Sequence, residues 1–351
     1  MKKIQIIIAV TFLMAIQITS VSARRRSAPV KLEKKVHNQY TVQANDQLAI
    51  DNCYGHVHIN TWDKNQMTID IVVTIEAGST AEAQDMLDNI TFNTESNENG
   101  RHRVYCKTVL TKPSHNKHTQ MTIDYTINTP RINPMDISNK YGDVYLADFS
   151  GMLEMNVQYG SLSTQVLSGT GKHITVAYGN ATINTLETGI CDISYSNLSI
   201  DQGDNLVVNN KYGQTNIEHV NNLKIEQRYG NMHIGSVKNI TGDADYANVD
   251  IGTLDKSADM FLKYCGRANF SSVSKYVDLL KLDVAYTALD LKINENANFT
   301  MDIKSSYGSV NHNNQACKVQ LDAQDSHCTG KMGNGTANMT INSRYSNINL
   351  N

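Results

Sequence analysis

The sequence predicts an all-β protein: a single-stranded β-solenoid of about 11–12 Tyr-Gly rungs with an N-terminal β-rich cap that contains one short helix. Two observations predict this class. Tyrosine recurs at intervals of 17 to 22 residues, and apolar residues alternate on both sides of each tyrosine. Such a period is typical of repeat proteins in which each unit pairs with its neighbours. A meander or propeller is the alternative, although a propeller blade usually needs about 40 residues.

The tyrosine series runs from position 141 to the C-terminal end, and one more Tyr-Gly pair lies near the start. Glycine follows seven of these tyrosines, and small residues follow most of the others. The predicted structural repeat residues are Tyr54, Gly55, Tyr141, Gly142, Tyr159, Gly160, Tyr178, Gly179, Tyr195, Tyr212, Gly213, Tyr229, Gly230, Tyr246, Tyr264, Tyr286, Tyr307, Gly308 and Tyr345.

The apolar alternation changes phase at each tyrosine. Ile174, Val176 and Tyr178 have the even spacing of one strand face, but the apolar residues then resume at Ala181 and Ile183. This shift requires a bend just after the tyrosine, where glycine reaches a positive φ without steric cost. We therefore predict a unit of strand, inward-facing tyrosine, glycine corner and strand, with the tyrosines stacked as an internal ladder.

Two places depart from the regular repeat. The Tyr264 unit has Arg267 at the usual apolar position, which indicates an insertion. Tyr307 and Tyr345 are 38 residues apart, about two repeats, and His327 lies near the position of the missing tyrosine. We expect a continuous array that Tyr345 closes.

The N-terminal region differs from the array. Lys2 and Lys3, an apolar run and the small residues that end at Ala23 predict a signal peptide over residues 1–23 rather than an uncleaved anchor. A polar linker (24–37), an N-terminal β cap with the first Tyr-Gly unit (38–130) and the repeat array (131–351) follow. Within the cap, the sequence predicts strands over 67–75, 90–94, 103–110 and 121–128, and a short helix over 79–87 with a serine or threonine cap.

Composition narrows the function. Without Lys2 and Lys3, 29 basic residues face 34 acidic ones, so the exported chain has a net charge of −5, which argues against nucleic acid as a partner. No transmembrane segment is expected after signal cleavage. The six cysteines have irregular spacing without a Cys-x-x-Cys pair, so we expect no zinc site and no cofactor. They could form disulfides in any of 15 pairings or remain as buried thiols.

Three features of the sequence occur together: the opening unit LAIDNCYGHVHINTWDKNQMTIDIVVTIEA, the short helix after it, and units such as SNKYGDVYLADF and EQRYGNMHIGSV. In these features the chain resembles the bacterial adhesin family of secreted β-strand-repeat proteins of unknown function, common in Bacteroidota. It implies an exported β-solenoid, with adhesion inferred for the family as a whole. The family has no catalytic motif to transfer.

Candidate chemical groups are few. His56 and His58 flank an inward valine and could grip a metal, although two exposed imidazoles on a strand are usually only solvated. Asp243 and Asp245 point outward from one repeat, where polysaccharide-degrading β-helices place carboxylates. His115 and His118 lie in a polar loop. We predict no catalytic, cofactor-binding or metal residue.

Three functions therefore compete. The first is an exported non-catalytic structural or interaction protein, an adhesin-like β-solenoid in the periplasm, at the cell surface or outside the cell. The second is a polysaccharide-acting β-helix enzyme, and the third a periplasmic accessory in envelope signalling or assembly. The partner, whether an envelope component, a glycan or a protein, is unknown from the sequence.

Overall fold

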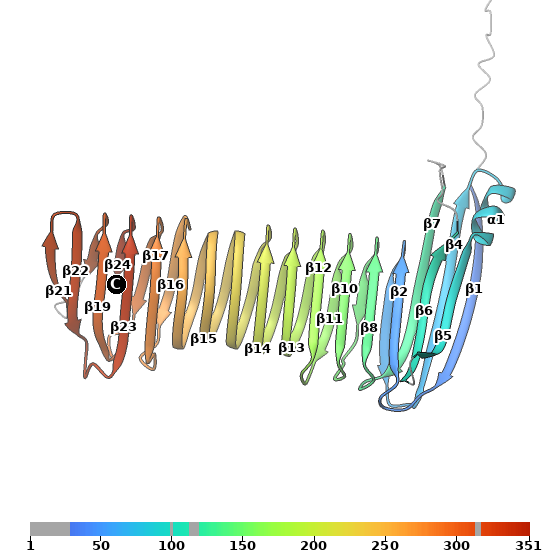
Figure 1. The fold of residues 1–351 in the computed structure, drawn as a ribbon, viewed down its shortest axis with the longest axis horizontal. Coiled ribbons are helices and arrows are strands. Elements are labelled where there is room, and N and C mark those ends of the chain that lie inside the picture. Colours follow the sequence, from blue (N-terminus) through green and yellow to red (C-terminus); the bar gives the residue numbers. More distant parts are fainter. Residues whose placement is uncertain (1–28, 99–100, 112–118, 313–316) are drawn as a thin grey trace, which may run out of the picture.

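The computed structural model describes residues 29–98, 101–111, 119–312 and 317–351. This part of the chain contains one helix and one long sheet of 24 strands, which lie side by side along a rod (Figure 1). The all-β class with one short helix is thus confirmed. The predicted signal peptide and the loop with His115 and His118 lie outside the described residues. No helix within the described ranges is long and apolar enough to cross a bilayer.

Each repeat contributes one strand before its tyrosine and one after it. Strands of the same kind pair in parallel from one repeat to the next, so two rows of strands run along the rod. At the start of the array the first row is β8 (Met135–Lys140), β10 (Leu153–Gln158) and β12 (Lys172–Ala177), and the second row is β9 (Val144–Leu146) and β11 (Leu162–Leu167).

The middle repeats merge into longer strands. β13 (Asn180–Ser194) and β14 (Asn197–Lys211) each span nearly the whole segment between two tyrosines. β15 (Thr215–Lys263) has 49 residues and continues past Tyr229 and Tyr246. Residues one repeat apart face each other, as Ile183, Ile200 and Ile217 do. The 17-residue period is therefore the register of the parallel pairing.

The core lies between the two rows. Ile174 and Val176 from the first row and Ala181 and Ile183 from the second are at most 1% exposed, and they belong to one hydrophobic cluster that extends through the array. The predicted inward alternation of these apolar residues is confirmed. Full burial of an aliphatic side chain contributes about 1.5–3 kcal/mol, so each repeat gains its stability from a few such residues.

The first Tyr-Gly unit starts the array. Its strands β2 (Gln47–Cys53) and β3 (Val57–Trp62) pair in parallel with β8 and β9, although paired residues such as Leu48 and Met135 are 87 positions apart in sequence. The intervening chain covers the end of the rod. It forms β4 (Gln66–Ala77), α1 (Thr80–Asp88), β5 (Ile90–Glu98), β6 (Arg101–Leu110) and β7 (Gln120–Pro130).

The predicted strands and helix of this region are present. Ser79 caps α1, and its side chain accepts a hydrogen bond of 3.2 Å from the backbone N–H of Glu82. β6 and β7 extend the two rows in parallel, and β4 pairs antiparallel with β7. β1 (Val30–Thr41) pairs antiparallel with β4 and begins inside the segment predicted as a polar linker. That linker prediction is wrong from Val30 on, because alternate residues of β1 are partly buried on the sheet.

The C-terminal end breaks the sequence order of the repeats. β23 (Ala337–Arg344) lies between β17 (Leu279–Ala285) and β19 (Phe299–Ser306) and pairs in parallel with both. In the second row, which includes β16 (Arg267–Val273), β24 (Ile348–Leu350) lies between β18 (Ala288–Ile293) and β20 (Val310–His312). Tyr345 therefore stacks between Tyr286 and Tyr307, and the prediction that it closes the series is wrong.

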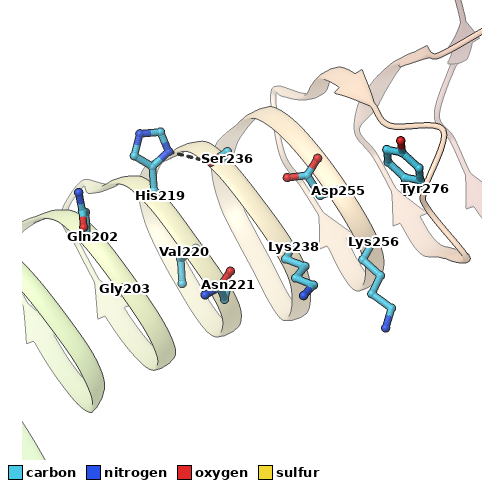
Figure 2. Close-up of a pocket in the computed structure, with 10 residues that line it drawn as sticks. All are labelled: Gln202, Gly203, His219, Val220, Asn221, Ser236, Lys238, Asp255, Lys256 and Tyr276. Atoms are coloured by element: carbon cyan, nitrogen blue, oxygen red, sulfur yellow. Dashed lines mark hydrogen bonds between the residues drawn. The ribbon is translucent and has the colours of Figure 1, made fainter. Parts of the chain in front are cut away.

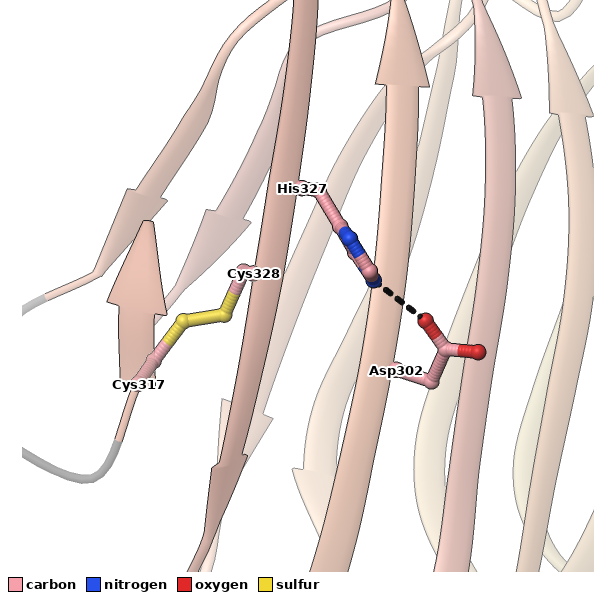
Figure 3. Close-up of a disulfide and its surroundings, with 4 residues drawn as sticks. All are labelled: Asp302, Cys317, His327 and Cys328. Carbon is pink, nitrogen blue, oxygen red and sulfur yellow. Dashed lines mark hydrogen bonds and ion pairs between the residues drawn. A yellow bond between two sulfur atoms is a disulfide. The ribbon is translucent and has the colours of Figure 1, made fainter. Parts of the chain in front are cut away.

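A hairpin covers the last repeat. β21 (Cys317–Asp322) and β22 (Asp325–Lys331) are antiparallel, and β22 pairs antiparallel with β19. Cys317 and Cys328 form a disulfide across the hairpin, and His327 hydrogen-bonds to Asp302 at 2.8 Å (Figure 3). His327 thus belongs to this antiparallel cover, and the prediction of a missing tyrosine rung there is wrong.

The other four cysteines are free thiols, of which three are buried. Burial raises the pKa of the Cys191 thiol to about 12, so it behaves as a small apolar core residue.

Candidate functional site

The twelve repeat tyrosines lie on the outside of the rod, which corrects the prediction of an internal ladder. Each is 40–55% exposed. Neighbouring rings stack with centroids 4.8–5.2 Å apart and interplanar angles of 2–18°. We call this row the tyrosine ladder. It runs through every repeat from Tyr54 to Tyr307, and its eleven gaps make it on the order of 55 Å long, because the rings repeat at the spacing of paired strands.

The backbone explains why the tyrosines point outward. All twelve have a left-handed conformation, with φ between 51° and 65°. A left-handed residue turns the chain sharply, so Tyr178 leaves the face of Ile174 and Val176 although it has the same sequence phase. The tyrosine itself is the corner residue, and the prediction that glycine supplies the positive φ is wrong for most units.

Glycine is needed after the tyrosine for another reason. A Cβ atom on Gly142 would lie 1.9 Å from the carbonyl oxygen of Gly55, and one on Gly160 would lie 2.0 Å from that of Gly142. At these two corners the backbones of successive repeats approach too closely for a side chain. The Tyr195 unit has serine instead of glycine, and Ser196 Oγ accepts from the N–H of Gly179 at 3.0 Å and donates to the carbonyl of Ser194 at 2.8 Å.

Buried amides hold the corners from inside. Asn52 donates to Asn139 Oδ1 at 3.1 Å, and Asn139 donates to the carbonyls of Gly55 and Gly142 at 3.1 and 2.8 Å. In a later repeat, Gln227 donates to the carbonyl of Gly213 at 2.9 Å. Hydrogen-bonded buried amides fix a unique backbone path, so the ladder is presented on a rigid frame.

The two flanks of the ladder have different chemistry. Two residues after the tyrosine, amides bond along the rod, as from Asn197 to Asn180 at 3.1 Å and from Asn248 to Asn231 at 3.0 Å. Immediately before the tyrosine, cations are frequent, and Lys140 Nζ lies 5.1 Å from the ring centroid of Tyr141. The other cations at this position are Lys211, Arg228, Lys263 and Arg344.

Stacking determines what the ladder can contact. Most ring faces are covered by the neighbouring rings, so the exposed surface consists mainly of ring edges and phenol groups, with amides on one side and cations on the other. Aromatic edges are electropositive, and a phenol both donates and accepts hydrogen bonds. The arrangement suits a long partner rich in oxygen atoms, held by many similar weak contacts.

A groove of about 760 Å³ crosses several repeats away from the ladder (Figure 2). His219 Nδ1 and Ser236 Oγ are 2.8 Å apart in it, and the exposed Tyr276 lies at one end. Asp255 is the only carboxylate among the residues that line it. The groove therefore lacks the pair of carboxylates that most glycoside hydrolases use.

The histidines predicted as candidate metal ligands do not form a common site. His56 and His58 are exposed on either side of the buried Val57, as expected. His56 Nδ1 accepts from the N–H of Asp143 at 3.2 Å, whereas His58 stacks on Tyr145 with ring centroids 4.5 Å apart. Within the described ranges, no group of three or more His, Cys, Asp or Glu residues could hold a metal.

Asp243 and Asp245 are partly exposed on either side of the buried Ala244, so they face outward as predicted.

One charged cluster on the outer face was missed in the sequence. His173 lies between two carboxylates, 3.0 Å from Glu154 and 2.7 Å from Asp192, and Asn209 also donates to Asp192 at 2.7 Å. The hydrogen bond to Asp192 raises the pKa of His173, burial opposes this, and the charge of Glu154 adds to it. Equivalent positions in successive repeats bring these residues together, so the 17–19 residue spacing was the available signal.

The position of the ladder was also missed, and a signal for it existed. Lys140, Lys211, Arg228, Lys263 and Arg344 precede their tyrosines directly. A cation immediately before the tyrosine and an amide two residues after the tyrosine indicate a corner in contact with water.

Comparison with known proteins gives structural neighbours only. No family model matches the sequence, and no curated protein matches it. Among solved structures, the chain is similar to a "putative adhesin" from Bacteroides fragilis, at 11% identity and a TM-score of 0.29, over 91% of this chain and 97% of the other. It is also similar to a "putative adhesin" from Parabacteroides merdae, at 8% identity and a TM-score of 0.30, over 91% and 96%.

A third neighbour is a "putative cell adhesion protein" from Clostridium sporogenes, at 10% identity and a TM-score of 0.21, over 90% of this chain and 99% of the other. These three neighbours are described in the terms of the adhesin family that the sequence resembles.

Proposed function

We propose that the protein is an exported, non-catalytic, adhesin-like β-solenoid that binds an extended glycan along the tyrosine ladder. The observation on which this rests is the unbroken row of twelve exposed, stacked tyrosines in left-handed conformation. The parallel pairing of residues one repeat apart and the 49-residue course of β15 past Tyr229 and Tyr246 support the solenoid.

The backbone cost favours a role for the side chain. A left-handed conformation costs a residue with a Cβ roughly 1–2 kcal/mol, and glycine or asparagine would avoid much of it. One aromatic stack contributes about 0.5–1.5 kcal/mol of stabilisation. Stacking thus only balances the strain, and the exposed phenol edge is what tyrosine adds at each corner.

The shape of the surface favours a linear polymer. The ladder repeats the same group at each strand spacing along the rod. Each phenol and flanking amide can hydrogen-bond to a sugar hydroxyl, and many weak contacts along one chain raise the total affinity strongly. A hydroxyl-rich glycan that lies along the rod matches this pattern.

A glycan array followed by titration tests the proposal. We expect the purified protein to bind at least one linear glycan, and the triple variant Tyr195→Phe, Tyr212→Phe, Tyr229→Phe, which keeps the ring stacks, to bind it several-fold more weakly. The variant Tyr276→Phe changes an exposed tyrosine outside the ladder and is the matched control, with affinity unchanged. Binding to no glycan, binding only to immobilised proteins, or equal affinity of the triple variant would overturn the proposal.

Export is a separate part of the proposal. It is supported by the predicted signal peptide and by the disulfide Cys317–Cys328, since disulfides persist mainly in oxidising compartments. Cell fractionation with protease treatment of intact cells should find the protein outside the cytoplasm. A cytoplasmic pool of the full-length chain would contradict it.

A further inference from the structure

A positively charged hollow lies beside the ladder near the C-terminal end of the rod. It has a volume of about 510 Å³ and is formed on the outer face of β15, β17, β23 and β19. Three cations, Lys263, Lys304 and Arg344, line it, with Asp283 as the one carboxylate among the lining residues. The protein as a whole has a net charge of −3, so this concentration of positive charge is local.

The strand register produces the hollow. Lys263, Ala285, Arg344 and Ser306 follow one another across the four strands, each directly before a ladder tyrosine. Long cations thus alternate with small residues. Two strand spacings, roughly 10 Å, separate Lys263 from Arg344, and the short Ala285 leaves the space between them open.

The out-of-order strand is essential to this site. Arg344 and Asn342 belong to β23, which enters between β17 and β19 from the end of the chain. Without that insertion, β17 and β19 would have no cation between them. Because β23 pairs out of sequence order, the sequence alone does not show that these residues lie together.

The carboxylates nearby pair with only one of the three cations, Lys304. Asp283 accepts a hydrogen bond from Asn342 Nδ2 at 3.0 Å. Asp302 pairs with Lys304 at 3.3 Å and with His327 at 2.8 Å. Lys263 and Arg344 have no carboxylate partner among the described residues, so both are available to an external anion.

We infer that this hollow binds an oxyanion group, a carboxylate or sulfate ester, of an acidic linear glycan. The glycan chain would continue along Tyr264, Tyr286, Tyr345 and Tyr307, whose rings form the adjacent ladder. An arginine forms a two-pronged contact with such groups, and a lysine adds a point charge. The inference rests on the proposed function and names the substrate class for it.

The test compares three soluble glycan polymers by calorimetry, polygalacturonate, dextran sulfate and neutral dextran, and adds polyglutamate as a polyanion that is not a glycan. We expect tighter binding of at least one charged polymer, and an affinity for it at least tenfold lower for Arg344→Gln and Lys263→Gln. Arg344→Lys should recover part of the affinity. Lys238→Gln, which removes a cation from the groove elsewhere on the rod, is the matched control and should change nothing. Thermal melts establish that each variant is folded.

The outcomes separate this inference from the proposed function. Equal affinity of the three polymers, or no effect of Arg344→Gln and Lys263→Gln, overturns the anionic class and leaves glycan binding intact. Binding of polyglutamate as tight as that of the charged glycans overturns the glycan class. If no polymer binds but glucuronate or sulfate shifts the amide resonances of residues 263 and 344 in the wild type only, the hollow is an anion site and the ladder proposal fails. The absence of both effects overturns both.

Discussion

At each tyrosine corner, ring stacking offsets the strain of the left-handed backbone. Tyr195 has φ of 51° and stacks between Tyr178 and Tyr212, with ring centroids 5.0 and 4.8 Å away. We expect Tyr195→Ala to lower the free energy of unfolding by about 1–3 kcal/mol, because two stacks are lost while the strained backbone remains. Tyr195→Asn should cost about 1 kcal/mol less, because asparagine tolerates the left-handed conformation.

Urea unfolding of the two variants measures this difference, with Tyr195→Phe as the control that keeps both stacks. If Tyr195→Ala and Tyr195→Asn were equally unstable, the left-handed backbone would not be a source of strain.

The glycine after the tyrosine is required for its small size rather than for a positive φ. In Gly160→Ala the new Cβ would meet the carbonyl oxygen of Gly142 at 2.0 Å, a backbone atom that cannot move alone. We expect a loss of about 1–3 kcal/mol in the free energy of unfolding, as for overpacked cores. In Gly78→Ala the nearest atom is 3.5 Å away on the side chain of Glu82, so the melting temperature of that control should stay near the wild-type value.

The His173 cluster makes stability depend on pH. Because the hydrogen bond to Asp192 raises the pKa of His173, the protonated imidazole stabilises the fold. This contribution is complete below the unfolded pKa of about 6.5 and is lost as the pH rises through the higher folded pKa. The melting temperature of His173→Gln should therefore fall below that of the wild type at about pH 5.5, and the two should converge near pH 9. A constant difference across this range would rule out the mechanism.

Among the elements, β23 and β24 have the largest effect on the C-terminal end. Removing residues 333–351 leaves β17 and β18 without parallel partners on one side and separates them from β19 and β20. We expect fast amide exchange over residues 299–312 and 317–331 in the truncated protein, with the middle repeats still protected. The double variant Cys317→Ser, Cys328→Ser should loosen only β21 and β22. Continued protection of residues 299–306 after truncation would mean that the last repeat can close directly on β17.

The elements also show what the sequence could predict. Strand alternation, the repeat period and the Ser79-capped helix follow from local patterns, and the structure contains them. The outward tyrosines do not follow, because a residue in phase with Ile174 and Val176 changes sides only through its backbone conformation. The insertion of β23 does not follow either, since every repeat carries a similar pattern and could pair with any other. The charged hollow depends on that insertion, so it required the structure.

On the scale of the whole molecule, contacts are between neighbours in the rod. Among the described residues, each repeat of the array pairs with the repeats that lie on either side of it in the rod, so stability is expected to behave as a sum of repeat and interface terms. A local lesion should then stay local. In Gly160→Ala, amide protection should fall over residues 144–177 and remain near the wild-type level over 249–285, about five repeats away.

Hydrogen exchange of the folded variant measures both regions at once, and Gly78→Ala again supplies the reference. An equal loss of protection in both regions would show that the rod unfolds as one cooperative unit. In that case the two end covers would set the stability of the entire ladder.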